Sequence, residues 1–172
     1  ENLKQEIENI KNEIQKMKSE SIEPLKKDQS VINNEIQKIK LENLNELNGI
    51  IGERAFEECS LLTKLSIPSS ITTIEKSAFI KCSNLTHLTI PSTVDTISPS
   101  AFKKCSSLSH IEINSLLNNI GFAVFSRCTS LTEISIPTSV KEIRSSAFFG
   151  CSSLKQVNFQ SPSSVTSIGG YC

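Results

Sequence analysis

The feature that most constrains this chain is a block of Ala, Phe and Cys that recurs every 23 residues. The stretch from Ala78 to Pro91 reads AFIKCSNLTHLTIP, and close copies of it fill most of the chain. The interval is kept by two columns, Phe56, Phe79, Phe102, Phe125 and Phe148, and Cys59, Cys82, Cys105, Cys128 and Cys151. A period of this length is typical of a solenoid, because one short coil cannot bury its apolar side without stacking on a neighbour. We therefore predict one rung of a solenoid for each copy.

Each copy contains two apolar segments. Leu88 and Ile90 alternate with polar residues, which predicts a short strand with one buried face. Pro91 follows directly and should end the strand, since proline cannot donate to a ladder. A second pair, Val94 and Ile97, lies three residues apart and is expected to point inward again before the next Ala-Phe pair. We predict that the Phe column forms the spine of the core.

The repeat pattern LxxIxIPxxVxxIxxxAFxxCSSL resembles the BspA-like leucine-rich repeat, found in surface and secreted proteins of bacteria and some protozoa. The resemblance covers about residues 47–172 and is carried by the proline after the strand together with the AFxxC block. It implies a curved solenoid with a parallel β-sheet on one face, used for binding and adhesion. Three departures predict an irregular sheet edge: Asn114 replaces the proline, Val124 replaces alanine, and two extra residues surround Pro162.

The first 46 residues differ in composition, being rich in Glu, Lys, Asn, Gln and Ile and lacking Gly and Cys. Their apolar residues are spaced alternately four and three apart, which predicts the seam of a coiled coil. The predicted interface consists of Leu3, Ile7, Ile10, Ile14, Met17, Ile32, Ile36 and Ile39. A kink is expected near Pro24, where the heptad resumes one residue out of step. The expected fold is thus an α+β repeat: a coiled-coil helix over residues 1–46, then a leucine-rich-repeat solenoid with a parallel β-sheet over residues 47–172.

The charges beside this seam favour a parallel homodimer. A parallel pair places Glu6 against Lys11 and Glu13 against Lys18, whereas an antiparallel pair places Glu against Glu. The homodimer through residues 1–46 is therefore our preferred interpretation. The sequence leaves open a heteromeric coiled-coil partner, a hairpin and a single solvated helix.

The regular spacing of the cysteines argues against both a metal site and a disulfide framework. Metal sites use CxxC pairs, and disulfide frameworks use varied spacings that join loops. One cysteine per rung predicts a ladder of buried, reduced thiols. Reduced thiols slightly favour an intracellular assembly, whereas the family resemblance favours the cell surface, so localisation stays open. Because the chain starts at Glu1 rather than Met and stops within a repeat, we expect a longer native protein.

The residues that alternate with the buried strand positions predict a protein-binding face. They form two polar columns, Lys64, His87, His110, Glu133 and Gln156, and Ser66, Thr89, Glu112, Ser135 and Asn158. A zinc site at the two histidines with Glu112 or Glu133 is an alternative, since imidazoles and carboxylates are zinc ligands. We prefer two solvated histidines and predict no metal, because the sequence offers no supporting second layer of hydrogen bonds.

Composition and motifs exclude several functions. The formal net charge of zero gives no attraction to nucleic acid or to an anionic membrane, and no apolar run is long enough to span a bilayer. The sequence has no Gly-rich phosphate loop, HExxH or nucleophile elbow, so we predict neither an enzyme nor a cofactor. Two hypotheses remain. One is a structural scaffold whose coiled-coil dimer presents a repeat surface to protein partners; the other is a cell-surface adhesin or antigen that binds host or matrix proteins.

Overall fold

The computed structural model describes residues 31, 34–35, 37, 43–44, 49–114 and 116–172. The chain divides into two compact units, residues 1–38 and 39–172, and the fold described below belongs to the second. The predicted coiled-coil interface, Leu3, Ile7, Ile10, Ile14, Met17, Ile32, Ile36 and Ile39, lies outside the described residues. Residues 49–114 and 116–172 contain strands and turns without a helix, so this part is a β-solenoid rather than an α+β fold.

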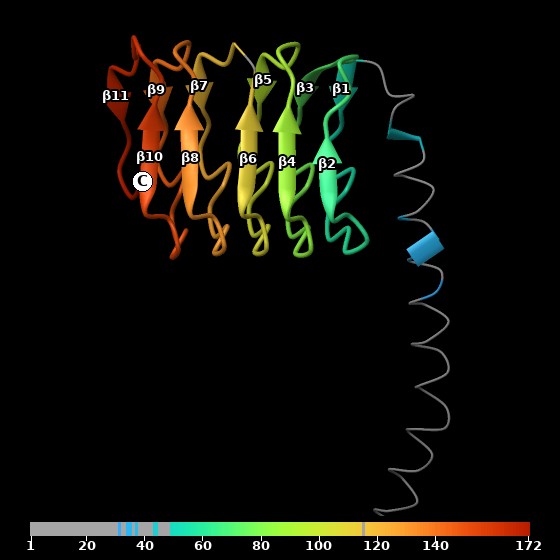
Figure 1. The fold of residues 1–172 in the computed structure, drawn as a ribbon. Helices are drawn as coiled ribbons and strands as arrows, with labels where there is room; N and C mark the ends of the chain where they lie inside the picture. Colours follow the sequence, from blue (N-terminus) through green and yellow to red (C-terminus); the bar gives the residue numbers. More distant parts are fainter. Residues whose placement is uncertain (1–30, 32–33, 36, 38–42, 45–48, 115) are drawn as a thin grey trace, which may run out of the picture. The chain divides into compact units, whose positions relative to one another are not determined.

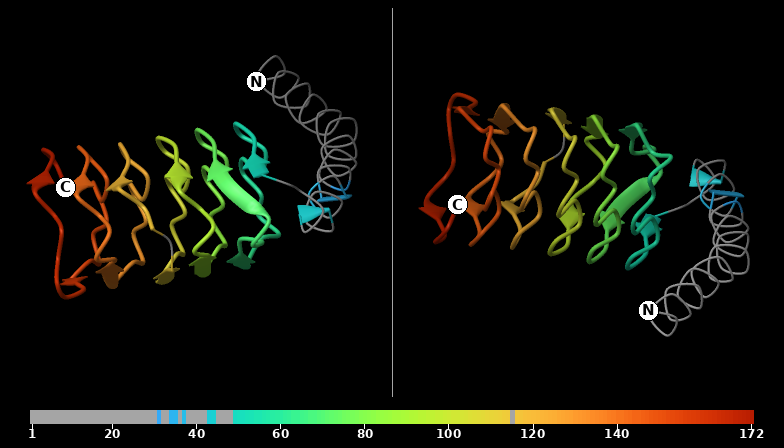
Figure 2. Two further views of the ribbon diagram at one scale, coloured as in Figure 1. Left: turned by 90° about the horizontal axis from the view of Figure 1, so that it is seen from above. Right: turned by 90° about the horizontal axis from the view of Figure 1, so that it is seen from below.

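The strands form two rows, which run in opposite directions in Figure 1. The front row consists of β2 (Lys64–Ser66), β4 (His87–Ile90), β6 (His110–Ile113), β8 (Glu133–Ile136) and β10 (Gln156–Phe159). The back row consists of β1 (Gly49–Ile51), β3 (Ile71–Ile74), β5 (Thr96–Ile97), β7 (Asn119–Ile120), β9 (Glu142–Ile143) and β11 (Ser167–Ile168). Neighbouring strands within each row pair in parallel, except that β6 does not pair with β8 and β5 does not pair with β7. The views from above and below show the rungs stacked in chain order (Figure 2).

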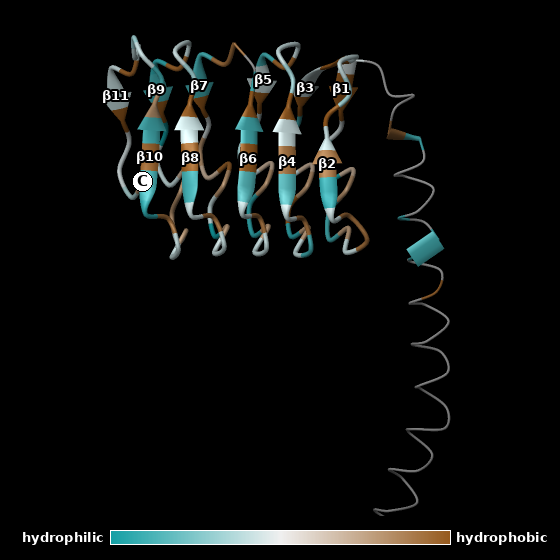
Figure 3. Ribbon diagram, in the orientation of Figure 1, coloured by the Kyte–Doolittle hydropathy of each residue, from teal (hydrophilic) through white to brown (hydrophobic). Residues whose placement is uncertain are grey.

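The front row has the alternation that the sequence predicts. In β8, Ile134 and Ile136 are buried while Glu133 and Ser135 are exposed, and Figure 3 shows the same alternation of hydropathy along the row. Strands β4 and β8 end directly before their prolines, as expected from the missing N–H.

The back row was not anticipated, because the resemblance implied a sheet on one face only. The apolar pairs of the return half do point inward: Ile71 and Ile74, for example, are fully buried. Since successive rungs have equal length, their return halves also come into register, and short parallel ladders form there. The last rung keeps this pairing despite its two extra residues, with Ser167 opposite Glu142.

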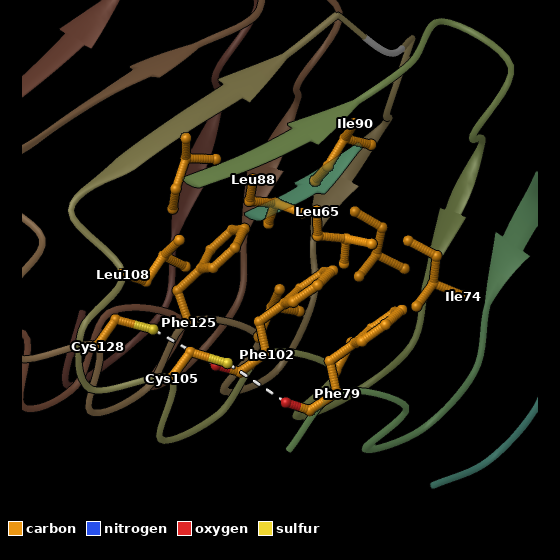
Figure 4. Close-up of a cluster of buried hydrophobic side chains, with 14 of the residues drawn as sticks. Leu65, Ile74, Phe79, Leu88, Ile90, Phe102, Cys105, Leu108, Phe125 and Cys128 are labelled. Carbon is orange, nitrogen blue, oxygen red and sulfur yellow. Dashed lines mark hydrogen bonds between the residues drawn. The ribbon is translucent and has the colours of Figure 1, made fainter. Parts of the chain in front are cut away.

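The phenylalanine column is the predicted spine. Phe79, Phe102 and Phe125 are among the largest fully buried side chains, and Figure 4 shows their rings stacked within the aliphatic core. The centroids of successive rings lie 5.0, 5.2, 5.8 and 5.9 Å apart, with interplanar angles of 3° to 13°. Aromatic rings at such separations attract one another in addition to their burial.

The cysteine column has a role that the sequence did not reveal. Its five members are buried, and none of the six cysteines, all of which the structure describes, is joined in a disulfide. From the second member on, each thiol donates to the phenylalanine carbonyl of the preceding rung: Cys82 to Phe56, Cys105 to Phe79, Cys128 to Phe102 and Cys151 to Phe125, over 3.1 to 3.4 Å (Figure 4). Cysteine therefore suits this position because it is small and apolar yet carries a weak donor.

The segments that lead from the back row to the next front-row strand form the rim of the solenoid, at the lower margin of Figure 1. They are residues 52–63, 75–86, 98–109, 121–132 and 144–155. Their backbones are joined rung to rung, as when the N–H of Phe102 donates to the carbonyl of Val124 over 3.0 Å. Two residues in each complete rim segment have positive φ, for instance Ser100 at 61° and Lys104 at 63°. These left-handed residues close the tight turns of the rim.

Both rows are interrupted at the same place. The front row divides between β6 and β8, and the back row divides between β5 and β7, where the strands stand visibly apart in Figure 1. The chain crosses this interruption after β6, in the segment that begins at Asn114. Asn114 is one of the sites at which the sequence predicts an irregular sheet edge. The irregularity lies instead in the middle of the solenoid. The rim continues across it, because Ser100, Phe102 and Lys104 donate to Phe122, Val124 and Ser126.

The substitution of alanine by Val124 has a local compensation. Val124 is fully buried, and Gly121 lies nearby in the same rung. A Cβ atom at Gly121 would come within 3.3 Å of the Val124 Cγ2 atom and 3.1 Å of the Ile97 carbonyl oxygen. Glycine thus leaves the space that the larger Val124 requires.

The cysteine column makes stability sensitive to alkaline pH. A hydrogen bond with Cys82 and burial raise the pKa of the Cys105 thiol well above its ordinary value. Above about pH 8.5 the unfolded chain releases the proton of this thiol, whereas the folded chain keeps it. The contribution of the thiol to stability is therefore complete below that pH and is lost as the pH rises toward the pKa of the folded state.

We expect the free energy of unfolding, measured with urea, to be lower at about pH 9.5 than at about pH 7. The Cys105→Ala variant serves as the control, because it should show a smaller loss over the same interval although it starts less stable. An identical pH dependence in the wild type and the variant would contradict the role assigned to this thiol.

Candidate binding surfaces

The front row brings the predicted binding residues into two outward columns. In the first column, the strand register aligns Lys64, His87 and His110 on β2, β4 and β6, and Glu133 with Gln156 on β8 and β10. In the second column, it aligns Ser66, Thr89 and Glu112 on the same three strands, and Ser135 with Asn158 on the same two. Thr89 and Asn158 are partly buried and the other eight residues are exposed. The interruption after β6 divides both columns, so the face consists of a three-strand and a two-strand part.

The three-strand part carries the histidines. The rings of His87 and His110 have centroids 5.6 Å apart at an angle of 48°. Nε2 of His110 lies 3.5 Å from Oε1 of Glu112, and Nδ1 of His87 lies within hydrogen-bond distance of the Thr86 hydroxyl, at 2.9 Å. Among the described residues no group of three or more His, Cys, Asp or Glu could hold a metal ion. The three-strand part thus presents two imidazoles and a carboxylate on an exposed surface.

The two-strand part is polar, and two of its side chains are hydrogen-bonded to each other. Nε2 of Gln156 donates to Oδ1 of Asn158 over 2.6 Å, which fixes both amide groups on the outer surface of β10. Glu133 and Ser135 are exposed beside them. This part therefore presents a carboxylate, a hydroxyl and two oriented amides in adjacent positions, a combination that can donate and accept hydrogen bonds.

A second polar surface lies on the rim and was missed by the sequence analysis. An open hollow of about 620 Å³ is lined by Glu58, Lys81, Ser83, Lys104, Ser106, Arg127 and Thr129. Three of these residues are cations in equivalent positions, each directly before the Cys column. Their 23-residue spacing is visible in the sequence. That they lie close together can be inferred only from the structure, in which the rim segments stack on one another.

The hollow has one neutralised end and one positive end. Lys81 forms an ion pair with Glu58 of the preceding rung. The hydrogen bond and the attraction between them lower the pKa of Glu58 and raise the pKa of Lys81. Lys104 and Arg127 have no acidic partner among the residues that the structure describes.

The family follows from the repeats. Residues 49–172 match the family described as the BspA type leucine rich repeat region, in six copies. Because the match covers most of the chain, the protein belongs to this family, as its AFxxC block predicted. Repeat regions of this class are generally binding scaffolds and are typically non-catalytic.

Solved structures support the same fold. A T. pallidum leucine rich repeat protein is 28% identical, with a TM-score of 0.57 over 70% of this chain. A leucine rich cell surface protein of Faecalibacterium prausnitzii is 24% identical, with a TM-score of 0.52 over 60% of this chain, and a leucine-rich repeat protein of Eubacterium ventriosum is 20% identical, with a TM-score of 0.58 over 64% of it. This chain covers 66%, 35% and 36% of those three proteins, respectively.

No curated protein sequence matches this chain. In the part of the chain that the structure describes, no helix has the length and apolar character needed to cross a membrane.

Proposed function

We propose that this protein is a non-catalytic scaffold that presents the front row of its solenoid to a protein partner. The observation that carries this proposal is the pair of outward columns, in which exposed side chains of different chemistry stand in register on successive strands. Such a surface combines cationic, anionic and hydrogen-bonding groups on a rigid support. Protein interfaces gain specificity from polar groups of this kind when a partner matches them.

The part of the face most suited to an anchoring contact is the pair His110 and Glu112 on β6. Both side chains are about half exposed, and β6 is the middle strand of the front row. A partner that covers the face can therefore contact both side chains near its centre. Residues at the centre of an interface typically contribute most of the binding free energy.

Replacing His110 and Glu112 by alanine should weaken binding of the partner about tenfold, the size expected when central interface contacts are lost. The partner is first recovered by affinity capture on the wild-type chain and is then titrated against purified variants. A matched control replaces Thr96→Ala and Glu142→Gln on the back row, which should leave the affinity unchanged. If the back-row variant loses binding and the front-row variant does not, the front row is not the binding face.

The second half of the proposal is self-association through residues 1–46, which would present two repeat surfaces at once. It rests on the sequence alone: the interface heptads and the pairing of Glu6 with Lys11 and Glu13 with Lys18. A dimer would raise the apparent affinity for a repetitive or dimeric partner, because the second contact becomes intramolecular.

Exchanging Glu6 and Glu13 for Lys should weaken self-association of the full chain, and exchanging Lys11 and Lys18 for Glu as well should restore it. Each exposed pair contributes only a few tenths of a kcal/mol, so sedimentation velocity is measured at low salt, where screening is least. Glu8→Lys, outside the predicted seam, is the control. A wild-type chain that stays monomeric at high concentration would rule out the homodimer and leave the hairpin, the single helix or a heteromeric partner.

A second candidate function is that of a cell-surface adhesin or antigen. It is favoured by the similarity to the F. prausnitzii protein, which is described as a leucine rich cell surface protein. The captured partner distinguishes the two functions. A host or matrix protein supports the adhesin, whereas a component of the same cell's own assemblies supports the scaffold.

A further inference from the structure

We propose that the hollow on the rim is a second binding site, separate from the front row, that takes an acidic peptide segment of a protein partner. Its cations are Lys81, Lys104 and Arg127, one from each of three successive rungs. The site lies on the part of the solenoid that stays continuous where both rows of strands are interrupted. It therefore has a firm backbone on which to hold a ligand.

The backbone fixes the spacing of these cations. The N–H of Lys81 donates to the carbonyl of Lys103, and the N–H of Lys104 donates to the carbonyl of Ser126, both over 2.8 Å. The N–H of Arg127 continues the series to Phe149 over 2.7 Å. Consecutive cations are thus held one rung apart, close to the ~4.8 Å separation of paired strands.

The three cations occupy backbone positions with positive φ, which residues other than glycine do not favour. Lys81, Lys104 and Arg127 have φ of 62°, 63° and 61°, in the left-handed region that glycine adopts without cost. The equivalent residue of the next rung is Gly150, with φ of 73°. Because Glu58 occupies the same position with φ of 56°, the turn itself does not require a cation at these three places.

Two of the three charges are available to a ligand. Lys81 is paired with Glu58, while Lys104 and Arg127 face no carboxylate among the described residues. Lysine and arginine bind carboxylates through charge-assisted hydrogen bonds, and arginine can hold both oxygens of one carboxylate. The hollow therefore fits a ligand with two neighbouring acidic groups.

The surrounding polar groups favour a peptide over a uniformly anionic polymer. The ion pair of Glu58 with Lys81 leaves one end of the hollow without net charge, so a long polyanion such as a nucleic acid or a sulfated glycan finds unpaired cations only at the other end. A short acidic segment matches that limited charge. No aromatic residue lines the hollow, so nucleic-acid bases would find no stacking partner.

The hydroxyl groups beside the cations complete the match to a peptide. The Thr129 hydroxyl donates to the Ser106 carbonyl over 3.2 Å, and the Ser106 hydroxyl donates to the Ser83 carbonyl over 3.5 Å. Because their protons are directed along the rim, the hydroxyl oxygens can accept hydrogen bonds from the backbone N–H groups of a peptide. We infer an extended segment with two acidic residues over Lys104 and Arg127 and an uncharged part near the Glu58–Lys81 pair.

The test uses the 172-residue chain and a fluorescein-labelled peptide in which two aspartates stand among glycines and serines, and binding is followed by fluorescence anisotropy. The variant Lys104→Glu/Arg127→Glu should bind at least about tenfold more weakly, since two exposed charge pairs are each replaced by a repulsion. Glutamate is tolerated at this position, because Glu58 occupies the equivalent place with φ of 56°. A second variant, Lys104→Gly/Arg127→Gly, removes the charges without straining the turns and should also lose binding.

The matched control is Lys76→Glu/Lys141→Glu, which changes the net charge equally outside the hollow and should bind the peptide like the wild type. Heparin, a uniformly anionic chain, should compete poorly. The proposal is overturned if the hollow variants bind as well as the control variant, or if heparin binds more tightly than the peptide and depends on the same cations. The front-row variant His110→Ala/Glu112→Ala should retain the peptide, so this result is independent of the proposed partner face.

Discussion

The rim is the constraint on which the rest of this solenoid depends. From the second segment on, each rim segment combines three interactions: the backbone bonds to the next rung, the stacked phenylalanine, and the thiol that donates to the preceding phenylalanine carbonyl, as Cys128 does to Phe102. The sheets do not provide the same continuity, because both rows are interrupted between the rungs of β6 and β8 and of β5 and β7. Across that interruption the rim bonds persist, and this explains how one core can extend through six repeats.

Much of this architecture is visible in the sequence, because the core columns repeat at one interval. The stacked rings, the buried thiols and the alternating front strands each follow from residues such as Phe79, Cys82 and Leu88. The back row could not be predicted in the same way, since strands of two residues such as Thr96–Ile97 are too short to show an alternation. The positive φ of Lys104 and the thiol-to-carbonyl bonds likewise depend on backbone geometry, which residue identity alone does not specify.

The candidate binding surfaces differ in how far they could be predicted. The outward columns of the front row follow directly from strand alternation, so the sequence alone predicts exposed residues such as His87 and His110. The hollow could not be predicted from the sequence, because Lys81, Lys104 and Arg127 lie in turns and the repeat pattern does not specify where the side chains of these turns point. This chain thus has two chemically distinct candidate surfaces on one solenoid, a mixed polar sheet face and a cationic rim.

The central claim is that the stacked phenylalanines of the rim hold the rungs together, and Phe102 tests it most directly. Phe102 is fully buried, whereas Phe122, in the same region, is 50% exposed and serves as the matched control. The free energy of unfolding of Phe102→Ala and Phe122→Ala is measured with urea. The account predicts a loss of about 3 to 5 kcal/mol for Phe102→Ala and of no more than about 0.5 kcal/mol for Phe122→Ala. Losses of similar size for both variants would contradict it.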